Sequence, residues 1–295
     1  MIEDLSGIVN LSETASLTSV VVKHAREAFA GPAQIEREWR DLSFTSAPDF
    51  GRAIDEYEGF LELLTRSGAD VHQLPSGTSV GLDAIYARDA SVVTPSGMVL
   101  CRMGKPLRSG EPAAQGLAFR EWGVPIAGVI EPPGTLEGGD VVWLNDRTLA
   151  VGRGYRTNDE GIAQLRAFAG PGIDVVVVPL PHWRGPGDVF HLMSVISPID
   201  TDLAVVYSPL MPIPFRERLL DVGYTLVDVP EEEFASMGAN VLAISPRRAI
   251  MLDGNPRTRA RLEQAGAEVL VYSGGEISVK GGGGPTCLTR PIRRG

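Results

Sequence analysis

The sequence predicts an α/β protein built from five consecutive units, each made of two strands, a helix and a third strand. Short runs of apolar and β-branched residues alternate with segments of helical period, and this order recurs five times. The recurrence is a structural rhythm and not a letter-by-letter repeat. Because no long linker or low-complexity stretch divides the 295 residues, we predict a single catalytic domain over 1–295 with its units arranged in a ring. A single open α/β sheet is the alternative, which periodicity alone does not exclude.

The first unit shows one strand before its helix. β-branched residues predict the strand at 18–22, and a short strand follows the helix at 71–74. The helix covers 50–67 and ends at Gly68. Its apolar face has helical spacing and consists of Ile54, Tyr57, Leu61 and Leu64.

The second unit has a clear turn signal at Pro95-Ser96-Gly97. We predict strands at 84–93 and 98–102 on either side of this turn, a helix at 113–122 and a closing strand at 126–130.

The third unit places strands at 141–144 and 149–151 around an Asn-Asp turn, and a closing strand at 175–178. Its helix begins with Thr157 and Glu160 in capping-box spacing. We therefore expect these two side chains to satisfy each other's free backbone donors.

The fourth and fifth units repeat the same order. The predicted strands of the fourth unit are 190–196, 203–207 and 225–227, with a helix at 215–222. Those of the fifth unit are 241–245, 249–252 and 268–271, with a helix at 256–265. The last strand pieces then lead into a glycine-rich loop.

Composition and charge limit the classes of function. The formal net charge of −10 argues against a nucleic-acid partner, which needs a basic face. No apolar run reaches the length of a membrane span, and Met-Ile-Glu-Asp at the start lacks the features of a secretory signal. With two cysteines and no signal, we predict a protein of the reducing cytoplasm.

The glycine-rich loop Gly281-Gly-Gly-Gly-Pro-Thr-Cys287 is the strongest indication of chemistry. A cysteine on such a loop is well placed to expose a thiolate nucleophile. Because the chain has only one other cysteine, Cys287 is not expected to belong to a disulfide framework.

Charged side chains and a histidine recur at predicted strand ends elsewhere in the chain. Alone, each has a common structural interpretation: an ion pair, a solvated turn, a structural histidine or a surface arginine. Their value lies in their number and order. They are Arg88-Asp89, Glu137-Gly-Gly-Asp140, His191, Arg108 and Arg156.

In this order the motifs resemble the guanidino-group-modifying enzymes, the superfamily of arginine deiminases, dimethylarginine dimethylaminohydrolases and amidinotransferases. The resemblance covers most of the chain, from the second unit onward. It implies a five-bladed, pseudo-symmetric α/β propeller (pentein), which agrees with the five units. The segments that carry it are Arg88-Asp89, Glu137 to Asp140, Gly152 to Asn158, His191-Leu192 and Gly281 to Cys287.

The resemblance implies a role for each of these side chains. Cys287 as a thiolate would attack the central carbon of a guanidinium that Asp89 holds and orients. His191 would protonate the departing amine and then activate water against a covalent thiouronium intermediate. Glu137 would hydrogen-bond His191 and raise its affinity for a proton. Asp140 would either contact the guanidinium or support this network.

Two arginines bear on the rest of the substrate. By the same resemblance, Arg108 and Arg156 match positions that bind a substrate carboxylate, which would make the substrate an α-amino acid with a guanidino tail. For each of them a surface arginine is the alternative.

The residue two positions after the histidine bears on substrate choice. Arginine deiminases usually carry an aspartate there, which grips the guanidinium from the other side, whereas this chain has Met193. Dimethylargininases also lack that aspartate, which favours them. Two features point the other way: dimethylargininases often have an acidic residue where this chain has Arg88, and the Gly-Gly-Pro-x-Cys loop is more similar to that of deiminases. The leading prediction is hydrolysis of dimethylarginine to citrulline and dimethylamine.

Arginine deimination and amidinotransfer are the alternative reactions, and a catalytically silent guanidine-binding protein is the alternative of another class. No cofactor or metal is expected, because the sequence has neither clustered Cys/His spacing nor a phosphate-cradling glycine loop before a clear helix. The expected partner is a small guanidino compound, and a homo-oligomer is compatible with the sequence.

Overall fold

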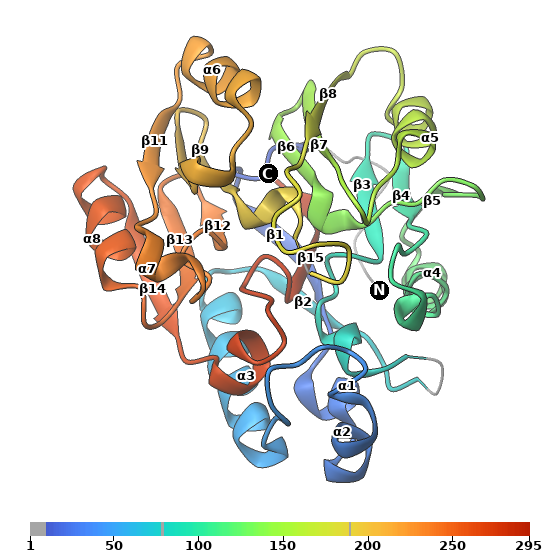
Figure 1. Ribbon diagram of the computed structural model, residues 1–295. Helices are drawn as coiled ribbons and strands as arrows, with labels where there is room; N and C mark the ends of the chain where they lie inside the picture. Colours follow the sequence, from blue (N-terminus) through green and yellow to red (C-terminus); the bar gives the residue numbers. More distant parts are fainter. Residues whose placement is uncertain (1–9, 78–79, 189) are drawn as a thin grey trace.

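Five three-stranded sheets surround a common centre in the computed structural model, and the helices lie at the periphery (Figure 1). The structure describes residues 10–77, 80–188 and 190–295. The predicted α/β class and the five units are confirmed. Within these ranges, no helix combines the length and the apolar character needed to cross a membrane.

The second to fifth units share one topology. In each sheet the first strand pairs antiparallel with the second, and the second pairs parallel with the third after a crossover helix. The elements are β3 Ser91–Thr94, β4 Gly97–Leu100, α4 Glu111–Trp122 and β5 Ile126–Val129; β6 Val141–Asn145, β7 Thr148–Arg153, α5 Asp159–Ala169 and β8 Asp174–Pro179; β9 Ile196–Asp200, β10 Leu203–Val206, α6 Ile213–Asp221 and β11 Thr225–Asp228; and β12 Val241–Ser245, β13 Arg248–Leu252, α8 Pro256–Gln264 and β14 Glu268–Tyr272, with the short α7 Glu231–Phe234 before β12.

The first unit is completed by the end of the chain. Strand β1 (Leu17–Val22) pairs antiparallel with β15 (Thr289–Arg294) and parallel with β2 (Asp70–Gln73). Strand β15 is not predicted from the sequence, because Thr-Arg-Pro-Ile-Arg-Arg is rich in charge and contains proline, which obscures strand propensity.

Helices α1 (Ala25–Phe29), α2 (Pro32–Glu38) and α3 (Phe50–Arg66) connect β1 to β2. Helix α3 packs its predicted apolar face inward, with Tyr57 and Leu64 fully buried and Ile54 only partly buried. Each fully buried side chain of this size stabilises the fold by about 1.5–3 kcal/mol.

Three local predictions are corrected by the structure. Residues 84–93 and 190–196 are not continuous strands: 3-10 helices cover Leu82–Ile85 and Leu192–Ser194, so the apolar residues there are buried on turns. Strand β14 leads into a π-helical turn at Gly275–Val279 instead of further strand.

A further correction concerns the start of α5. Asn158, not Thr157, caps this helix by accepting a hydrogen bond from the Gly161 backbone at 2.9 Å. The Thr157 hydroxyl instead donates to Asp140 Oδ2 at 2.6 Å, because the buried carboxylate is the stronger acceptor.

Candidate active site

One functional side chain lies just before the first strand of each sheet. Asp89 precedes β3, Asp140 precedes β6, His191 precedes β9 and Cys287 precedes β15. Asn240 occupies this place before β12 and was not predicted. The sheets surround one centre (Figure 1), so these strand starts can face a common region.

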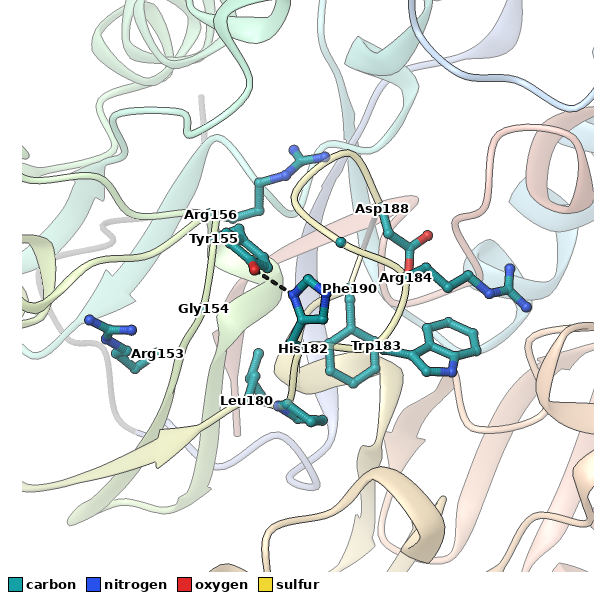
Figure 2. A pocket seen from close by; sticks show the side chains of 12 residues that line it. Arg153, Gly154, Tyr155, Arg156, Leu180, His182, Trp183, Arg184, Asp188 and Phe190 are labelled. Carbon is teal, nitrogen blue, oxygen red and sulfur yellow. Dashed lines mark hydrogen bonds between the residues drawn. The ribbon is translucent and has the colours of Figure 1, made fainter.

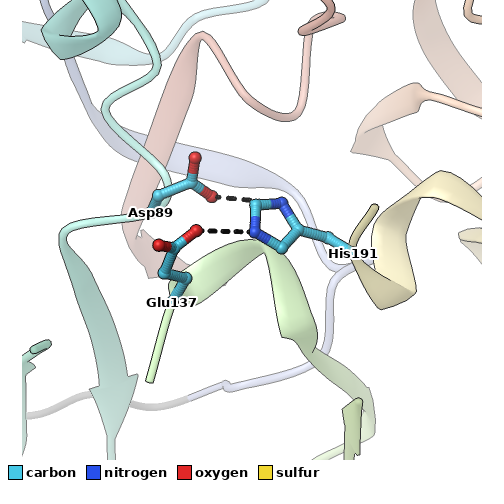
Figure 3. A group of neighbouring side chains, drawn as sticks. All are labelled: Asp89, Glu137 and His191. Carbon is cyan, nitrogen blue, oxygen red and sulfur yellow. Dashed lines mark hydrogen bonds and ion pairs between the residues drawn. The ribbon is translucent and has the colours of Figure 1, made fainter. Parts of the chain in front are cut away.

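His191 lies between two carboxylates, as Figure 3 shows. Its Nε2 is 2.8 Å from Glu137 Oε2, and its Nδ1 is 3.8 Å from Asp89 Oδ1. All three side chains are buried. Burial alone would lower the pKa of His191, but Asp89, Asp140 and Glu137 outweigh it and raise the pKa to about 9. The imidazole is therefore charged at neutral pH.

Gly139 allows these groups to meet. A Cβ atom at this position would lie 2.5 Å from His191 Nδ1 and 2.7 Å from Asp89 Oδ1. The Gly139 backbone N–H also donates to Asp89 Oδ1 at 3.0 Å. Any side chain at this position would displace the histidine or the aspartate, which explains the glycine in this turn.

Arg108 fixes the other oxygen of Asp89. Its Nη1 donates to Asp89 Oδ2 at 2.6 Å, while Nε and Nη2 each donate to Glu111 at 2.8 Å. Nη2 also reaches the backbone carbonyls of Asp83 and Tyr86, each at 3.2 Å. The guanidinium of Arg108 is thus buried and engaged on all of its nitrogens.

Glu137 is held as an anion by its surroundings. Its Oε1 accepts hydrogen bonds from the backbone of Gly104 and Lys105, and Arg156 Nη1 lies 3.2 Å away. Although burial opposes ionisation, His191 and Arg156 hold the pKa of Glu137 well below its usual range. A carboxylate in this state can keep a proton on the neighbouring imidazole.

Asp140 faces the backbone that carries His191. It accepts a hydrogen bond from the Leu192 N–H at 3.0 Å and one from Thr157, and it is completely buried. Burial raises the pKa of Asp140 to about 6. These contacts fix the direction in which the His191 segment enters its 3-10 helix.

Cys287 and His191 line the same cavity, which has a volume of about 240 Å³. Met193, Asn240 and Phe234 form other parts of its wall. The cavity therefore combines a thiol, a charged imidazole and an apolar surface.

Asn240 contacts the thiol directly. Its Nδ2 donates to Cys287 Sγ at 3.2 Å, while its Oδ1 accepts hydrogen bonds from the Thr286 N–H at 3.0 Å and the Thr286 hydroxyl at 2.8 Å. Burial and the charge of Asp89 raise the pKa of the Cys287 thiol, and the hydrogen bond from Asn240 opposes them. An isolated asparagine gives no sequence signal, but its place before the first strand of its unit is the one that holds functional residues in the other units.

A second cavity, also of about 240 Å³, adjoins the first. Arg156, Tyr155 and His182 line it, and Figure 2 shows the Tyr155 hydroxyl and His182 Nδ1 in contact at 2.5 Å. The two cavities share the walls formed by Trp183, Arg184, Asp188 and Phe190.

Among the described residues, Asp89, Glu137 and His191 offer possible metal-ligand atoms that all lie within 4.8 Å of one another. The same side chains are already engaged, because Glu137 contacts His191 and Arg108 contacts Asp89. These contacts already occupy polar atoms that a cation would need, and the absence of a metal stays a prediction.

A partly buried thiol, a charged imidazole and a fixed aspartate lie where five α/β sheets meet, an arrangement that agrees with the guanidino-group-modifying enzymes of the pentein superfamily. Comparison with known protein families gives the narrower assignment. The family model for eukaryotic N,N dimethylarginine dimethylhydrolase matches residues 38–294, and the chain belongs to this family. It is therefore an enzyme that hydrolyses C–N bonds of linear amidines.

Individual relatives agree with this assignment. The chain is 31% identical over 246 residues to an N(G),N(G)-dimethylarginine dimethylaminohydrolase of Streptomyces coelicolor, covering 83% of this chain and 88% of the relative.

Solved structures share the fold. A cysteine-to-serine mutant of the Pseudomonas aeruginosa enzyme complexed with citrulline superimposes with a TM-score of 0.76 at 22% identity, over 95% of this chain and all (100%) of that one. An amidinotransferase of saxitoxin biosynthesis from Microseira wollei gives 0.78 at 16% identity, over 98% and 97% of the two chains.

Proposed function

We propose that this enzyme hydrolyses dimethylarginine to citrulline and dimethylamine, with Cys287 as the nucleophile and His191 as the acid and base. The observation that carries the proposal is that Cys287 and His191 face one cavity, while buried carboxylates keep His191 protonated. We also propose that the five sheets close into a single propeller domain over 1–295.

Substrate binding prepares the nucleophile. Asp89 raises the pKa of the resting Cys287 thiol, so a guanidinium cation placed between them reverses the local charge and favours the thiolate. Asp89 retains lone pairs for the substrate N–H groups, since a carboxylate accepts about four hydrogen bonds. Arg108 and the Gly139 N–H hold this carboxylate in one orientation.

The reaction then proceeds in two steps. The Cys287 thiolate adds to the guanidinium carbon, His191 gives its proton to the dimethylated nitrogen, and the C–N bond breaks to release dimethylamine. His191, now neutral, takes a proton from water, whose oxygen adds to the carbon of the thiouronium. Collapse of this adduct breaks the C–S bond, releases citrulline and restores Cys287.

The apolar wall favours a methylated nitrogen. Met193 offers a polarisable apolar surface to the cavity, and Phe190 and Phe234 line it as well. An unmethylated guanidinium would leave its N–H groups facing this surface without an acceptor, which is costly. This contrast favours dimethylarginine over arginine.

Arg156 is proposed to bind the substrate carboxylate. It lines the second cavity, which shares walls with the first, so an amino-acid tail can extend from one cavity into the other. For Arg108, the contacts with Asp89 and Glu111 favour a positioning role over the carboxylate contact expected from the resemblance. For Asp140, the contacts with Leu192 and Thr157 favour support of the histidine segment.

Product analysis tests the proposal. Purified enzyme is incubated with asymmetric dimethylarginine or with arginine, and citrulline, dimethylamine and ammonia are quantified by mass spectrometry. We expect citrulline and dimethylamine in equal amounts. Faster ammonia release from arginine would instead assign arginine deimination, and transfer of the amidino group to added ornithine or glycine would assign amidinotransfer.

Substitution of the cysteine tests the mechanism. Cys287→Ser is expected to abolish turnover while thermal unfolding stays near that of the wild type. Cys101→Ala, at the buried cysteine outside the cavity, is the matched control and should retain activity. A haloacetamidine should label Cys287 faster than a free thiol; an unreactive Cys287 would instead favour the non-catalytic binding protein.

A further inference from the structure

A second buried charge cluster lies behind the catalytic segment and takes no part in the proposed reaction. Arg88 pairs with Glu13 through two hydrogen bonds, Nη1–Oε1 at 3.2 Å and Nη2–Oε2 at 3.0 Å. Arg294 Nη2 lies 4.0 Å from Glu13 Oε2, and Arg290 Nη2 donates to the Arg88 carbonyl at 2.9 Å. We call Glu13, Arg88, Arg290 and Arg294 the central cluster.

The central cluster has an excess of positive charge. Its three arginines are only 1%, 2% and 4% exposed, and Glu13 supplies the one carboxylate among its members. Asp89 also acts on Arg290 through its charge, but it is held by Arg108. Burial and the charge of Arg88 lower the pKa of Arg290 to about 9 and that of Arg294 to about 10, although Glu13 opposes both. Arginine nevertheless stays protonated in proteins, so the excess charge needs a counter-ion.

Several donors of the cluster lack a protein acceptor. Among the described ranges, no hydrogen-bond partner is present for Nε of Arg88, Nε of Arg290, or Nε and Nη2 of Arg294. The other donors fix these side chains, since Arg294 Nη1 donates to the carbonyls of Ala15 and Ala243 at 2.6 and 2.9 Å. The free donors therefore cannot turn toward bulk water without breaking buried hydrogen bonds.

Two small voids lie against these donors. Each has a volume of about 10 Å³, roughly that needed for one water-sized particle. Arg88, Arg294 and Glu13 line both voids, and Arg290 lines one of them.

All five sheets contribute to the walls around the cluster. Glu13 donates its backbone N–H to Trp143 of β6, and residues of β9 and β12 line one void. Arg290 and Arg294 belong to β15, and Arg88 lies three residues before β3. The voids thus lie among residues from several different sheets.

We propose that a small monovalent inorganic anion of the chloride class binds in the central cluster between Arg88, Arg290 and Arg294. Such an ion would accept hydrogen bonds from the free donors and offset the excess charge at the same time. Water would satisfy the donors but leave the charge uncompensated, which is the more costly deficit. The small volume of the voids favours a monatomic ion over a polyatomic organic anion.

The position of the ion links it to the catalytic segment through the backbone. The Arg88 N–H donates to the Cys287 carbonyl at 3.1 Å, and Arg290 holds the Arg88 carbonyl. Bound anion would therefore stabilise the backbone on which Asp89 and Cys287 are carried.

Crystallography with bromide tests the proposal on the full chain. Crystals soaked in sodium bromide and measured at the bromine absorption edge should show an anomalous peak within hydrogen-bond distance of Arg290 or Arg294. Density without anomalous signal at this place, indicating water only, would overturn the proposal.

A solution measurement provides the second arm. At constant ionic strength, replacing sodium gluconate by sodium chloride should raise the unfolding temperature in a saturable way, by about 2–4 °C once chloride exceeds its Kd about fivefold. Glu13→Gln should enlarge the chloride-dependent rise in unfolding temperature, because it removes the carboxylate that competes with the anion for the arginines. Arg294→Gln should reduce this rise. Arg247→Gln, at a partly exposed arginine paired with Asp202, is the control and should leave it unchanged. An identical response to chloride in wild type, Glu13→Gln and Arg247→Gln would contradict a central site even if Arg294→Gln failed to fold.

Discussion

Replacing Glu137 by glutamine should lower the pKa of His191 and shift the alkaline limb of activity to lower pH. In the folded protein the pKa of His191 rises from 6.5 to about 9. This rise corresponds to roughly 3 kcal/mol in favour of the charged imidazole. Three carboxylates share it, and Glu137 acts both through its charge and through the 2.8 Å hydrogen bond.

If Glu137 accounts for about one third to one half of this rise, the pKa of His191 should be about 1 lower in Glu137→Gln than in the wild type. Glutamine retains an oxygen that can accept the hydrogen bond, so the orientation of the imidazole is preserved. Arg156, left without its carboxylate partner, opposes protonation of His191 in the same direction. At pH 9 the protonated fraction falls from about one half to about one tenth, so an acid-dependent rate falls about fivefold, while at pH 7 it changes little.

The assay is kcat/KM for citrulline formation between pH 6 and 10, together with NMR titration of the histidine side chains. His191→Gln assigns the His191 signal among the four histidines. Glu233→Gln is the matched control, because Glu233 is also buried and accepts hydrogen bonds, but from Thr258 at the start of α8. An unchanged alkaline pKa in Glu137→Gln, or an equal shift in Glu233→Gln, would refute the assigned origin of the charge on His191.

Three further predictions follow from the same site. Asn240→Ala removes a hydrogen bond worth about 1 kcal/mol, so the pKa of the Cys287 thiol should rise by about 0.7. Alkylation of Cys287 at pH 7 should therefore slow about fivefold, and an unchanged alkylation rate would show that Asn240 does not stabilise the thiolate. Met193→Asp adds a hydrogen-bond acceptor for an unmethylated N–H. The ratio of kcat/KM for arginine to kcat/KM for dimethylarginine should therefore rise about tenfold. A constant ratio would show that Met193 does not face the substituted nitrogen. The folded pKa of His191 lies above its ordinary value, so its contribution to stability is fully present below about pH 6.5 and is lost as pH rises through about 9. Urea unfolding should therefore give a steeper loss of stability from pH 7 to 9.5 in wild type than in His191→Gln, and parallel curves would contradict the charged state.

The sequence predicted those parts of the fold and site that are local in the chain. Each unit carries its own apolar rhythm, and the motifs around Asp89, Glu137, His191 and Cys287 are recognisable because each combines unusual neighbours. Contacts between units could not be predicted from local sequence patterns. The engagement of Arg108 by Asp89 and Glu111 depends on where the chain folds back, which spacing does not specify.

Two omissions have a common physical cause. Strand β15 contains arginines that are buried only because Glu13 and backbone carbonyls from other units receive them, and on its own the segment looks solvent-exposed. Asn240 has meaning only beside Cys287, 47 residues away. In both cases tertiary contacts override the local signal, which is typical of functional centres.

The pairing of β15 with β1 has a consequence for the order in which activity appears. Leu17 faces Arg294 in this pair, so the contact joins two segments that are far apart in the sequence, and such long loops close slowly. Cys287, the proposed nucleophile, lies two residues before β15, so we expect it to be aligned only when β15 has paired with β1. Four sheets can assemble from contiguous segments while the protein is still inert. Regained catalysis thus reports closure of the chain's two ends, and should lag behind the return of secondary structure during refolding.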